Sequence, residues 1–456
     1  MQTAFSQFLN FQLDSCSESL TVIPPSPLTF YLEILVTSAN IFIKDDFDQY
    51  KANKSLESEL LEKLNELNFS DSYTNFLKSE IKLQWAILKL KNGEEFSSFW
   101  SLRHAYNIAK ENVIKNPEFL PSYKTLGLLH VLYGVFPDKY NWILSILGIE
   151  GNVHAGLSEL DKVYKSDQLL SLECGITVAL LQAYLLNDPV KGADQMRIIH
   201  AKKKQLLIDY AFALILMKNA QSERALNIID DSEYIYSQPF ILPQLYYLKG
   251  EVLLQKGHLD EAIKNYQIFI SRHEGQNLVK DTYYKIGICY LIKDMPDSTK
   301  KYFERSWQKG WAKNEADKNA KNALESDHNS TKELYQLRYA SDGGFYEKAL
   351  KIHEQIDTIN LNEHDKCEYY YRTARLYHKT GNIENAVSNY HKTIKFQKNT
   401  NWYYAPNSAL QLGLICLSEN NNEAAIEYLH LVNNYSGYPY QNSIRQKVKT
   451  TLKELE

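Results

Sequence analysis

The sequence lacks any apolar run long enough to cross a membrane. A membrane-spanning helix needs ~18 or more consecutive apolar residues. The best candidate, TFYLEILVTSANIFI at 29–43, is interrupted by Glu33, Ser38 and Asn40. We therefore expect a soluble chain without a transmembrane span.

Cysteine is scarce, with five residues that are odd in number and scattered along the chain. Most of them lie inside apolar helical runs such as IGICYLI and LGLICLS. This placement is typical of small core residues and excludes a disulfide framework or a cysteine zinc site. The five are Cys16, Cys174, Cys289, Cys367 and Cys416.

An excess of charge of one sign is also missing. The 51 lysines and arginines nearly balance the 55 aspartates and glutamates, for a formal net charge of -4. A polyanion such as nucleic acid attracts a strongly basic surface, which this balance does not provide. We expect no nucleic-acid partner.

Motifs for chemistry are absent as well. The chain has no G-x-x-x-x-G-K-[ST] phosphate loop, no G-x-G-x-x-G between a strand and a helix, and no H-E-x-x-H or C-x-x-C metal spacing. The run HDKCE at 364–368 reads as a helix start, where acidic residues favour the positive N-terminus. The sequence predicts a protein that is not an enzyme and uses no cofactor or metal. A hydrolase hidden in the irregular segment 134–156 is an alternative.

The first residues lack the basic start and unbroken apolar stretch of a secretory signal. The letters LDSC suggest a lipoprotein cleavage box at Cys16, but Gln7, Asn10 and Gln12 make the preceding stretch too polar. We expect an amphipathic first helix. If Met1 replaces a removed signal, the protein is periplasmic or exported; otherwise it is cytoplasmic.

A repeat is present instead. The small residue that ends a YY..G motif is followed twelve positions later by a second small residue, and this pairing returns along the chain. Successive first positions are 37, 37, 50, 37 and 39 residues apart. The pairs are Ala213 and Ala225, Gly250 and Ala262, Gly287 and Thr299, Ala374 and Ala386, and Gly413 and Ala425. A sixth, more degenerate unit has Leu337 in the first position and Ala349 twelve later.

Small residues at this spacing let the two helices of a hairpin approach closely. A bulky residue follows the second small residue by four positions, for example Tyr266 and Tyr390. These units resemble tetratricopeptide repeats, whose usual period is about 34 residues. The resemblance covers roughly 206–452 and implies an all-α superhelical array of antiparallel helix hairpins, that is, a tetratricopeptide-like α-solenoid.

Three regions follow from this pattern. We expect an N-terminal segment at 1–27, a divergent helical-hairpin region at 28–205, and an array of about six repeat units at 206–456. The array carries an insertion near 309–329, where KGWAKNEADKNAKNALESDHN reads as a short extra helix or as a mobile loop.

The divergent region contains an unusual glycine-rich stretch, LYGVFPDKYNWILSILGIEGNVHAGLSELDKV. Glycines within a helical pattern are costly unless the backbone turns tightly or packs closely there. The stretch, within 127–160, resembles a signature of the tetratricopeptide repeat protein 39 family and its bacterial relatives. The correspondents are Phe136-Pro137, Trp142 to Leu147, Gly148 to Gly151, and Gly156-Leu157. The resemblance implies an exported protein in bacteria and adaptor roles in eukaryotes.

The candidate partner-binding residues come from two positions on the first helix of each unit. Three residues before the first small residue, four of the six units have tyrosine, a large flat ring with a hydroxyl that suits binding surfaces. One residue after it, the chain has acidic Glu251 near one end and basic Arg338 and Arg375 near the other. The candidates are Tyr210, Tyr247, Tyr284, Tyr371, Glu251, Arg338 and Arg375.

Two readings of the tyrosines remain open: they line an open groove, or they stack between neighbouring repeats. The predicted function is a non-enzymatic scaffold or adaptor that binds a protein or peptide in the concave groove of the array. The alternative is a glycan-binding helical protein associated with the outer membrane. That alternative requires a lipidated N-terminal cysteine and tryptophan platforms, whereas the six tryptophans are dispersed.

Overall fold

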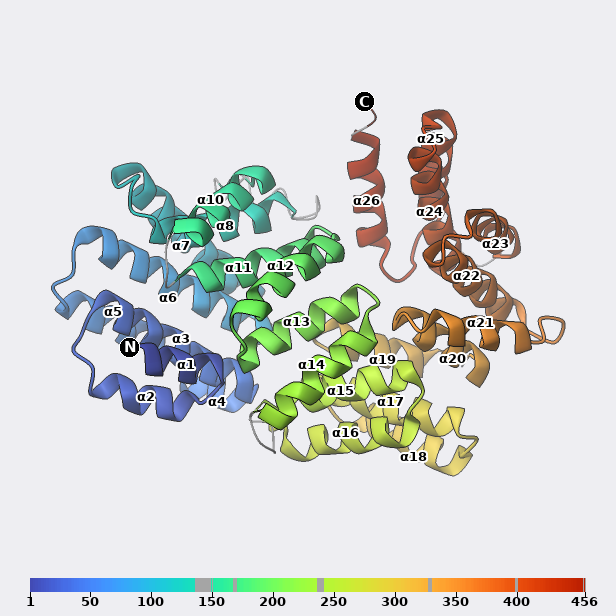
Figure 1. Cartoon of the computed structure of the whole chain (residues 1–456), viewed down its shortest axis with the longest axis horizontal. Helices are drawn as coiled ribbons and strands as arrows, with labels where there is room; N and C mark the ends of the chain where they lie inside the picture. Colours follow the sequence, from blue (N-terminus) through green and yellow to red (C-terminus); the bar gives the residue numbers. More distant parts are fainter. Residues whose placement is uncertain are drawn as a thin grey trace. The chain divides into compact units, whose positions relative to one another are not determined.

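A computed structural model describes the whole chain except residues 136–148, 150, 167–169, 236–241, 327–329, 398–400, 454 and 456 (Figure 1). Throughout the described ranges the regular structure is helical, and no strand occurs in them. None of the described helices is long and apolar enough to span a membrane. The predicted all-α fold of helix hairpins is confirmed.

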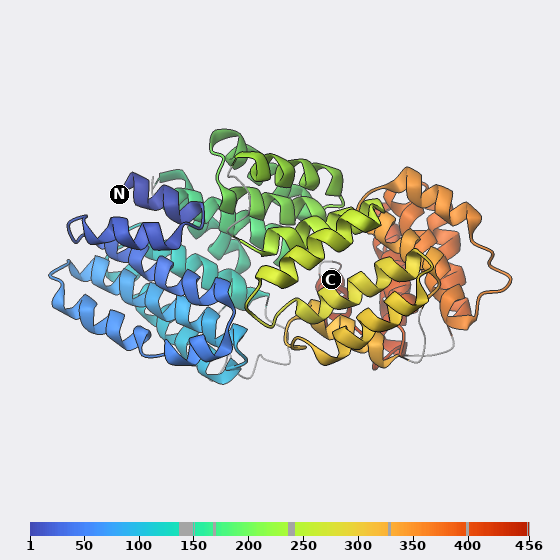
Figure 2. The ribbon, with the colours of Figure 1, turned by 90° about the horizontal axis from the view of Figure 1, so that it is seen from below.

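The chain divides into two compact units. Unit 1 comprises Met1–Val252, Asp260–Gly287 and Lys300–Glu325. Most of its helices follow one another as antiparallel neighbours joined by short connections (Figures 1 and 2). The helices from the N-terminus to the end of unit 1 are α1 Gln2–Leu9, α2 Leu13–Thr21, α3 Pro27–Lys44, α4 Phe47–Ala52, α5 Leu56–Glu66, α6 Asp71–Lys91, α7 Glu95–Lys115, α8 Pro121–Gly134, α10 Val153–Ser166, α11 Leu170–Leu180 with the π-helical turn η2 Leu181–Leu185, α12 Pro189–Lys202, α13 Leu206–Lys218, α14 Ser222–Ile235, α15 Gln244–Lys256, α16 Leu259–Arg272, α17 Val279–Ile292, α18 Pro296–Gln308 and α19 Glu315–Glu325.

Unit 2 comprises Leu253–Leu259, Ile288–Thr299 and Ser326–Glu456. Its main part consists of three hairpins and a final helix. They are α20 Lys332–Asp342 with α21 Tyr346–Gln355, α22 Glu363–Lys379 with α23 Ile383–Phe396, α24 Tyr404–Ser418 with α25 Asn422–Leu431, the 3-10 turn η3 Val432–Asn434 and α26 Gln441–Lys453.

The N-terminal residues form the expected amphipathic helices. Ala4, Leu13 and Cys16 of α1 and α2 are buried and pack in one cluster with Leu32 and Val36 of α3. Cys16 is thus a core residue, and four of the five cysteines are buried, none in a disulfide. The interpretation of the cysteines as core residues is confirmed.

The glycine-rich stretch packs two helices backbone to backbone. A Cβ atom added to Gly127 of α8 would lie 2.8 Å from the carbonyl oxygen of Gly156 of α10, and one added to Gly156 would lie 2.5 Å from that of Gly127. Any side chain would separate these helices, which explains the glycines. The Phe136-Pro137 pair, Trp142 to Leu147 and Gly148 lie outside the described residues.

The predicted repeat register is confirmed. Each pair of small residues lies on the two helices of one hairpin, from α13 and α14 to α24 and α25. All of these residues except Thr299 are buried. A Cβ atom added to Gly287 would lie 2.4 Å from the ring of Phe303. A Cβ atom added to Gly413 would lie 2.9 Å from the side chain of Leu429.

The insertion between the third and fourth hairpins contains a helix. Residues Glu315–Glu325 form α19, whose Asp317 and Ala320 are buried. Of the two alternatives that the sequence allowed, an extra helix is therefore the correct one. Its buried aspartate takes part in the polar network described next.

Candidate functional site

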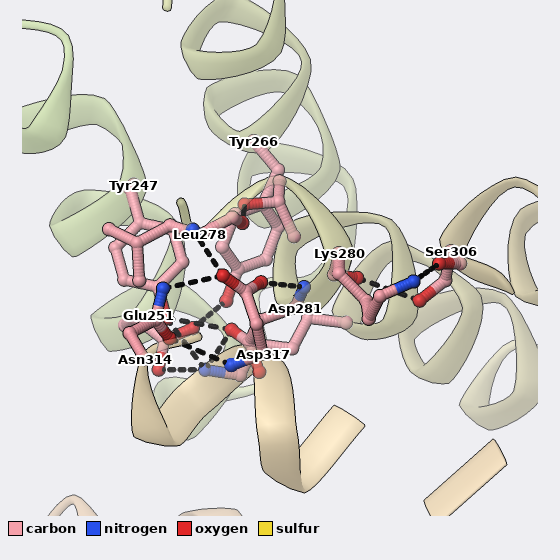
Figure 3. A network of polar contacts seen from close by, with 11 residues as sticks. Tyr247, Glu251, Tyr266, Leu278, Lys280, Asp281, Ser306, Asn314 and Asp317 are labelled. Carbon is pink, nitrogen blue, oxygen red and sulfur yellow. Dashed lines mark hydrogen bonds and ion pairs between the residues drawn. The ribbon is translucent and has the colours of Figure 1, made fainter. Parts of the chain in front are cut away.

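Two polar clusters contain most of the candidate residues, one in each unit. The network in unit 1 surrounds Tyr247 and Glu251 of α15 (Figure 3). The Tyr247 hydroxyl donates a hydrogen bond to Asp281 Oδ2 at 2.7 Å, and the Tyr266 hydroxyl donates to Glu251. Lys285 forms ion pairs with both Glu251 and Asp281. The acidic candidate Glu251 is thus already neutralised by a lysine.

Asp317 of α19 completes this network by capping another helix. Its carboxylate accepts hydrogen bonds from the backbone N–H groups of Leu278 at 2.7 Å and Asp281 at 2.8 Å, where α17 begins. Asn314, which immediately precedes α19, donates a hydrogen bond to the same carboxylate. Burial raises the pKa of Asp317 to about 6, in spite of these hydrogen bonds.

The charged centre of the unit 1 network is mostly buried. The side chains of Glu251 and Lys285 are 15% and 12% exposed, and each contacts the other. Burial, with the neighbouring carboxylates Asp281 and Glu251, raises the pKa of Tyr247 well above its usual value. We interpret the network as a connection between α15, α16, α17 and α19 that holds these helices together.

The tyrosine positions differ in exposure. Tyr210 and Tyr247 are half-buried, whereas Tyr284 is 7% and Tyr371 1% exposed. The ring of Tyr284 stacks on Phe303 with centroids 5.3 Å apart. Tyr371 contacts the rings of Tyr403 and Tyr404, each at 5.5 Å. Tyr371 contacts rings of the next hairpin, as the reading of tyrosines stacked between repeats expects. Tyr284 is also buried, but it stacks within its own hairpin, between α17 and α18.

The second cluster lies in unit 2 and contains Arg338 of α20 with Arg372 and Arg375 of α22; we call it the arginine cluster. Arg372 is 6% exposed, and its Nε atom donates to Glu368 Oε1 at 3.2 Å. Its Nη2 atom donates to the Tyr403 hydroxyl at 2.8 Å. This guanidinium group is fully engaged by its neighbours.

Arg375 has a different environment. Its Nη1 atom donates to the Tyr371 hydroxyl at 3.3 Å, and Asn407 of α24 donates to the same oxygen at 2.6 Å. Among the described residues, no carboxylate lies within ion-pair distance of Arg375. Burial, together with the charge of Arg375, lowers the pKa of Lys379. The region around Arg375 therefore has more positive than negative charge, although Asp342 acts on Arg375 from beyond ion-pair distance.

Arg338 is partly exposed. Its side chain is 40% exposed, and Nε lies 3.8 Å from Asp342 Oδ2 at the next turn of α20. The Nε atom itself is buried and has no hydrogen-bond acceptor in the described part of the protein. The exposed part of this side chain, rather than the buried Nε, is what an external acceptor can reach.

Sequence reasoning found Arg338, Arg375 and Tyr371 but missed their neighbours. Arg372 lies one helical turn before Arg375, and this spacing was a usable signal. No pattern in the sequence indicates that Asn407 and Tyr403, from the next hairpin, complete the cluster. Only the packing of α24 against α22 brings them there.

A possible metal site lies beside this cluster and is not supported. His364, Asp365 and Glu368 offer ligand atoms within 4.8 Å of one another. Glu368, however, already accepts hydrogen bonds from Arg372 and from the Ser330 hydroxyl. Because a metal cation would compete with a guanidinium group for the same carboxylate, we assign Glu368 to the arginine cluster.

Comparison with protein-family models shows the family of this chain. The model described as Iml2/Tetratricopeptide repeat protein 39 matches residues 56–309, more than half of the chain. The chain belongs to this family. A second model, described as a tetratricopeptide repeat, matches residues 368–400, which include most of α22 and all of α23. The resemblance inferred from the glycine-rich stretch and the repeats is confirmed.

Solved structures with similar folds are distant in sequence. A tetratricopeptide repeat protein from Parabacteroides merdae is 14% identical over 61% of this chain and 99% of its own, with a TM-score of 0.25. A Rap protein complexed with competence and sporulation factor is 13% identical over 80% and 98%, with a TM-score of 0.37. Yeast Tom70 is 13% identical over 98% and 93%, with a TM-score of 0.28. A comparison with curated protein sequences returned no significant match.

Proposed function

We propose that this member of the family is a non-enzymatic scaffold that binds a partner protein through unit 2. The binding surface is the face formed by the first helices of its three hairpins, α20, α22 and α24, which we call the first-helix face. The observation that carries the proposal is the arginine cluster on this face, with its unbalanced charge and the 40% exposed side chain of Arg338.

The architecture supports this assignment. The first helices of successive hairpins pack on one another, α20 on α22 and α22 on α24. Side chains from three repeats therefore lie on one continuous surface, which is the usual way in which repeat proteins bind extended partners. Leu414 of α24, which follows Gly413 as Arg375 follows Ala374, is 36% exposed and extends this surface.

A catalytic role gains no support from the two clusters. In unit 1 the carboxylates pair with Lys285 or accept backbone N–H groups, and in unit 2 Glu368 pairs with Arg372. The glycan-binding alternative gains none either. Trp85 is buried in the core, and the exposed Trp100 and Trp307 lie on different helices, α7 and α18.

Site-specific photo-cross-linking tests the proposal. A benzophenone amino acid at position 414, on the first-helix face, should cross-link a discrete partner protein in cells that express the full chain. The matched control places the same group at Leu90 of α6, which is 53% exposed in unit 1. Cross-linking of the same partner at position 90 but not at 414 would contradict the proposed surface.

A further inference from the structure

The arginine cluster has more positive than negative charge. It contains three guanidinium groups, whereas the carboxylates beside it are Glu368, bonded to Arg372, and Asp342, 3.8 Å from Arg338. Asp342 is 41% exposed, so its attraction to Arg338 is weakened by water. An acceptor with negative charge would find Arg338 and Arg375 incompletely paired.

Asp342 also shows that the three arginines face a common region. Burial alone would lower the pKa of Arg338 and Arg372. Nearby tyrosines, and then Asp342 and Glu368, favour the charged form more strongly, so the pKa of both arginines is raised. For Arg375 the contact with Tyr371 acts first and Asp342 also contributes to the raised pKa. One carboxylate thus interacts electrostatically with three guanidinium groups from two helices.

The surrounding contacts hold this arrangement rigidly. Glu368 accepts from Arg372 and from the Ser330 hydroxyl, and the Tyr371 hydroxyl accepts from both Arg375 and Asn407. Tyr371 is 1% exposed. Tyr371 is a positioning residue, since its hydroxyl accepts from Arg375 and orients that guanidinium group. A preorganised cation pair loses little entropy when it binds.

We propose that Arg338 and Arg375 bind carboxylate groups of an acidic segment in the partner protein. This inference rests on the proposed function and names the chemistry of its partner. The planar guanidinium group matches a carboxylate in a forked pair of hydrogen bonds, and the Arg338 side chain is 40% exposed, so a carboxylate can reach it. Carboxylates of the partner replace the weak contact with Asp342.

A nucleic acid fits the cluster less well. Proteins bind single strands by stacking bases on accessible aromatic rings. Here the rings of Tyr371 and Tyr404 are 1% and 6% exposed and contact one another, so they offer no such platform. The near-balanced charge of the whole chain also differs from that of a polyanion-binding surface.

The test uses the full-length protein and a fluorescein-labelled peptide rich in glutamate, with fluorescence anisotropy as the readout. The variant is R338Q/R375Q, which removes both charges and keeps a polar side chain at each position. The matched control is R197Q/R305Q, two exposed arginines of unit 1, which changes the net charge by the same amount. Circular dichroism and thermal melting of both variants verify that they are folded.

The wild-type protein and R197Q/R305Q should bind the glutamate peptide with equal affinity. R338Q/R375Q should bind about tenfold or more weakly, the loss expected for even one charged hydrogen bond. The same peptide with glutamine at every glutamate should not bind. If R338Q/R375Q melts at a lower temperature, R338K/R375K replaces it, and lysine should restore part of the affinity by charge alone.

Three results would overturn the inference: no binding of the glutamate peptide to wild type, equal loss in both double variants, or preferential binding of a single-stranded oligonucleotide to the same arginines. Failure of the proposed function looks different. In that case the peptide still binds through Arg338 and Arg375, but no partner protein cross-links at position 414. If a partner cross-links at position 414 but binds R338Q/R375Q as tightly as the wild type, the proposed scaffold function holds. The inference that the partner supplies an acidic segment is then wrong.

Discussion

Gly250 of α15 contacts the ring of Tyr266 of α16: a Cβ atom added to Gly250 would lie 2.7 Å from both Cδ1 and Cε1 of that ring. Tyr266 is fully buried, and its hydroxyl bonds to Glu251. One contact therefore sets how closely the two helices of the hairpin approach and anchors the polar network of unit 1.

The change Gly250→Ala should destabilise the protein by ~1–3 kcal/mol, because the added methyl group forces the Tyr266 ring to move in a packed core. Urea unfolding measures the loss. The control is the same change in a Tyr266→Ala background, where the ring is absent and the cost of Gly250→Ala should shrink. An equal cost in both backgrounds would show that the ring is not the cause.

The change Ala386→Phe should also overpack a hairpin, at a cost of ~1–3 kcal/mol, since Ala386 is fully buried between α22 and α23. Ser388→Phe is the matched control on the exposed side of the same helix and should be nearly neutral. Thermal melting compares the two. Similar melting temperatures for both variants would mean that the assigned register is wrong.

The change Tyr371→Ala should cost ~3–5 kcal/mol, because it leaves a cavity beneath Arg375 and Asn407. The change Tyr371→Phe keeps the ring and removes only the hydroxyl, so its cost should be ~1 kcal/mol. Chemical denaturation of the two variants separates ring packing from hydrogen bonding. If Tyr371→Ala were as stable as the wild type, Tyr371 would be a surface contact rather than a core residue.

The pKa of Asp317 predicts a pH dependence. Its folded-state pKa of about 6 lies above the ordinary value of 3.8, so between these pH values the folded state binds more protons than the unfolded state. The contribution of this group to stability therefore decreases as pH rises from about 4 to about 6, by ~2–3 kcal/mol.

Unfolding free energies at several pH values in this window test that sign. Asp317→Asn cannot titrate, so its stability should fall less steeply with rising pH than that of the wild type. The variant should be about as stable as the wild type at low pH, where the protonated aspartate and asparagine both lack a second strong acceptor for the α17 cap. Parallel pH profiles for the two proteins would show that Asp317 has an ordinary pKa.

The sequence alone determined the hairpins and their register. Small residues such as Gly250 and Ala262 recur with bulky residues such as Tyr266, and helical periodicity converts this spacing into contacts between two adjacent helices. Gly156 likewise marked a close approach of backbones. These features are local, since both partners of each contact lie within one hairpin or two successive helices.

Only the tertiary structure decided which candidates are accessible. The positions of Tyr371 and Arg375 on α22 differ by one helical turn, yet the tyrosine is in the core and the arginine is partly exposed. The pairing of Glu251 with Lys285, and the contact of Asn407 with Tyr371, connect residues more than thirty positions apart. Such contacts depend on the angle at which one hairpin packs on the next. That angle follows from the fit of many side chains, which no spacing in the sequence specifies.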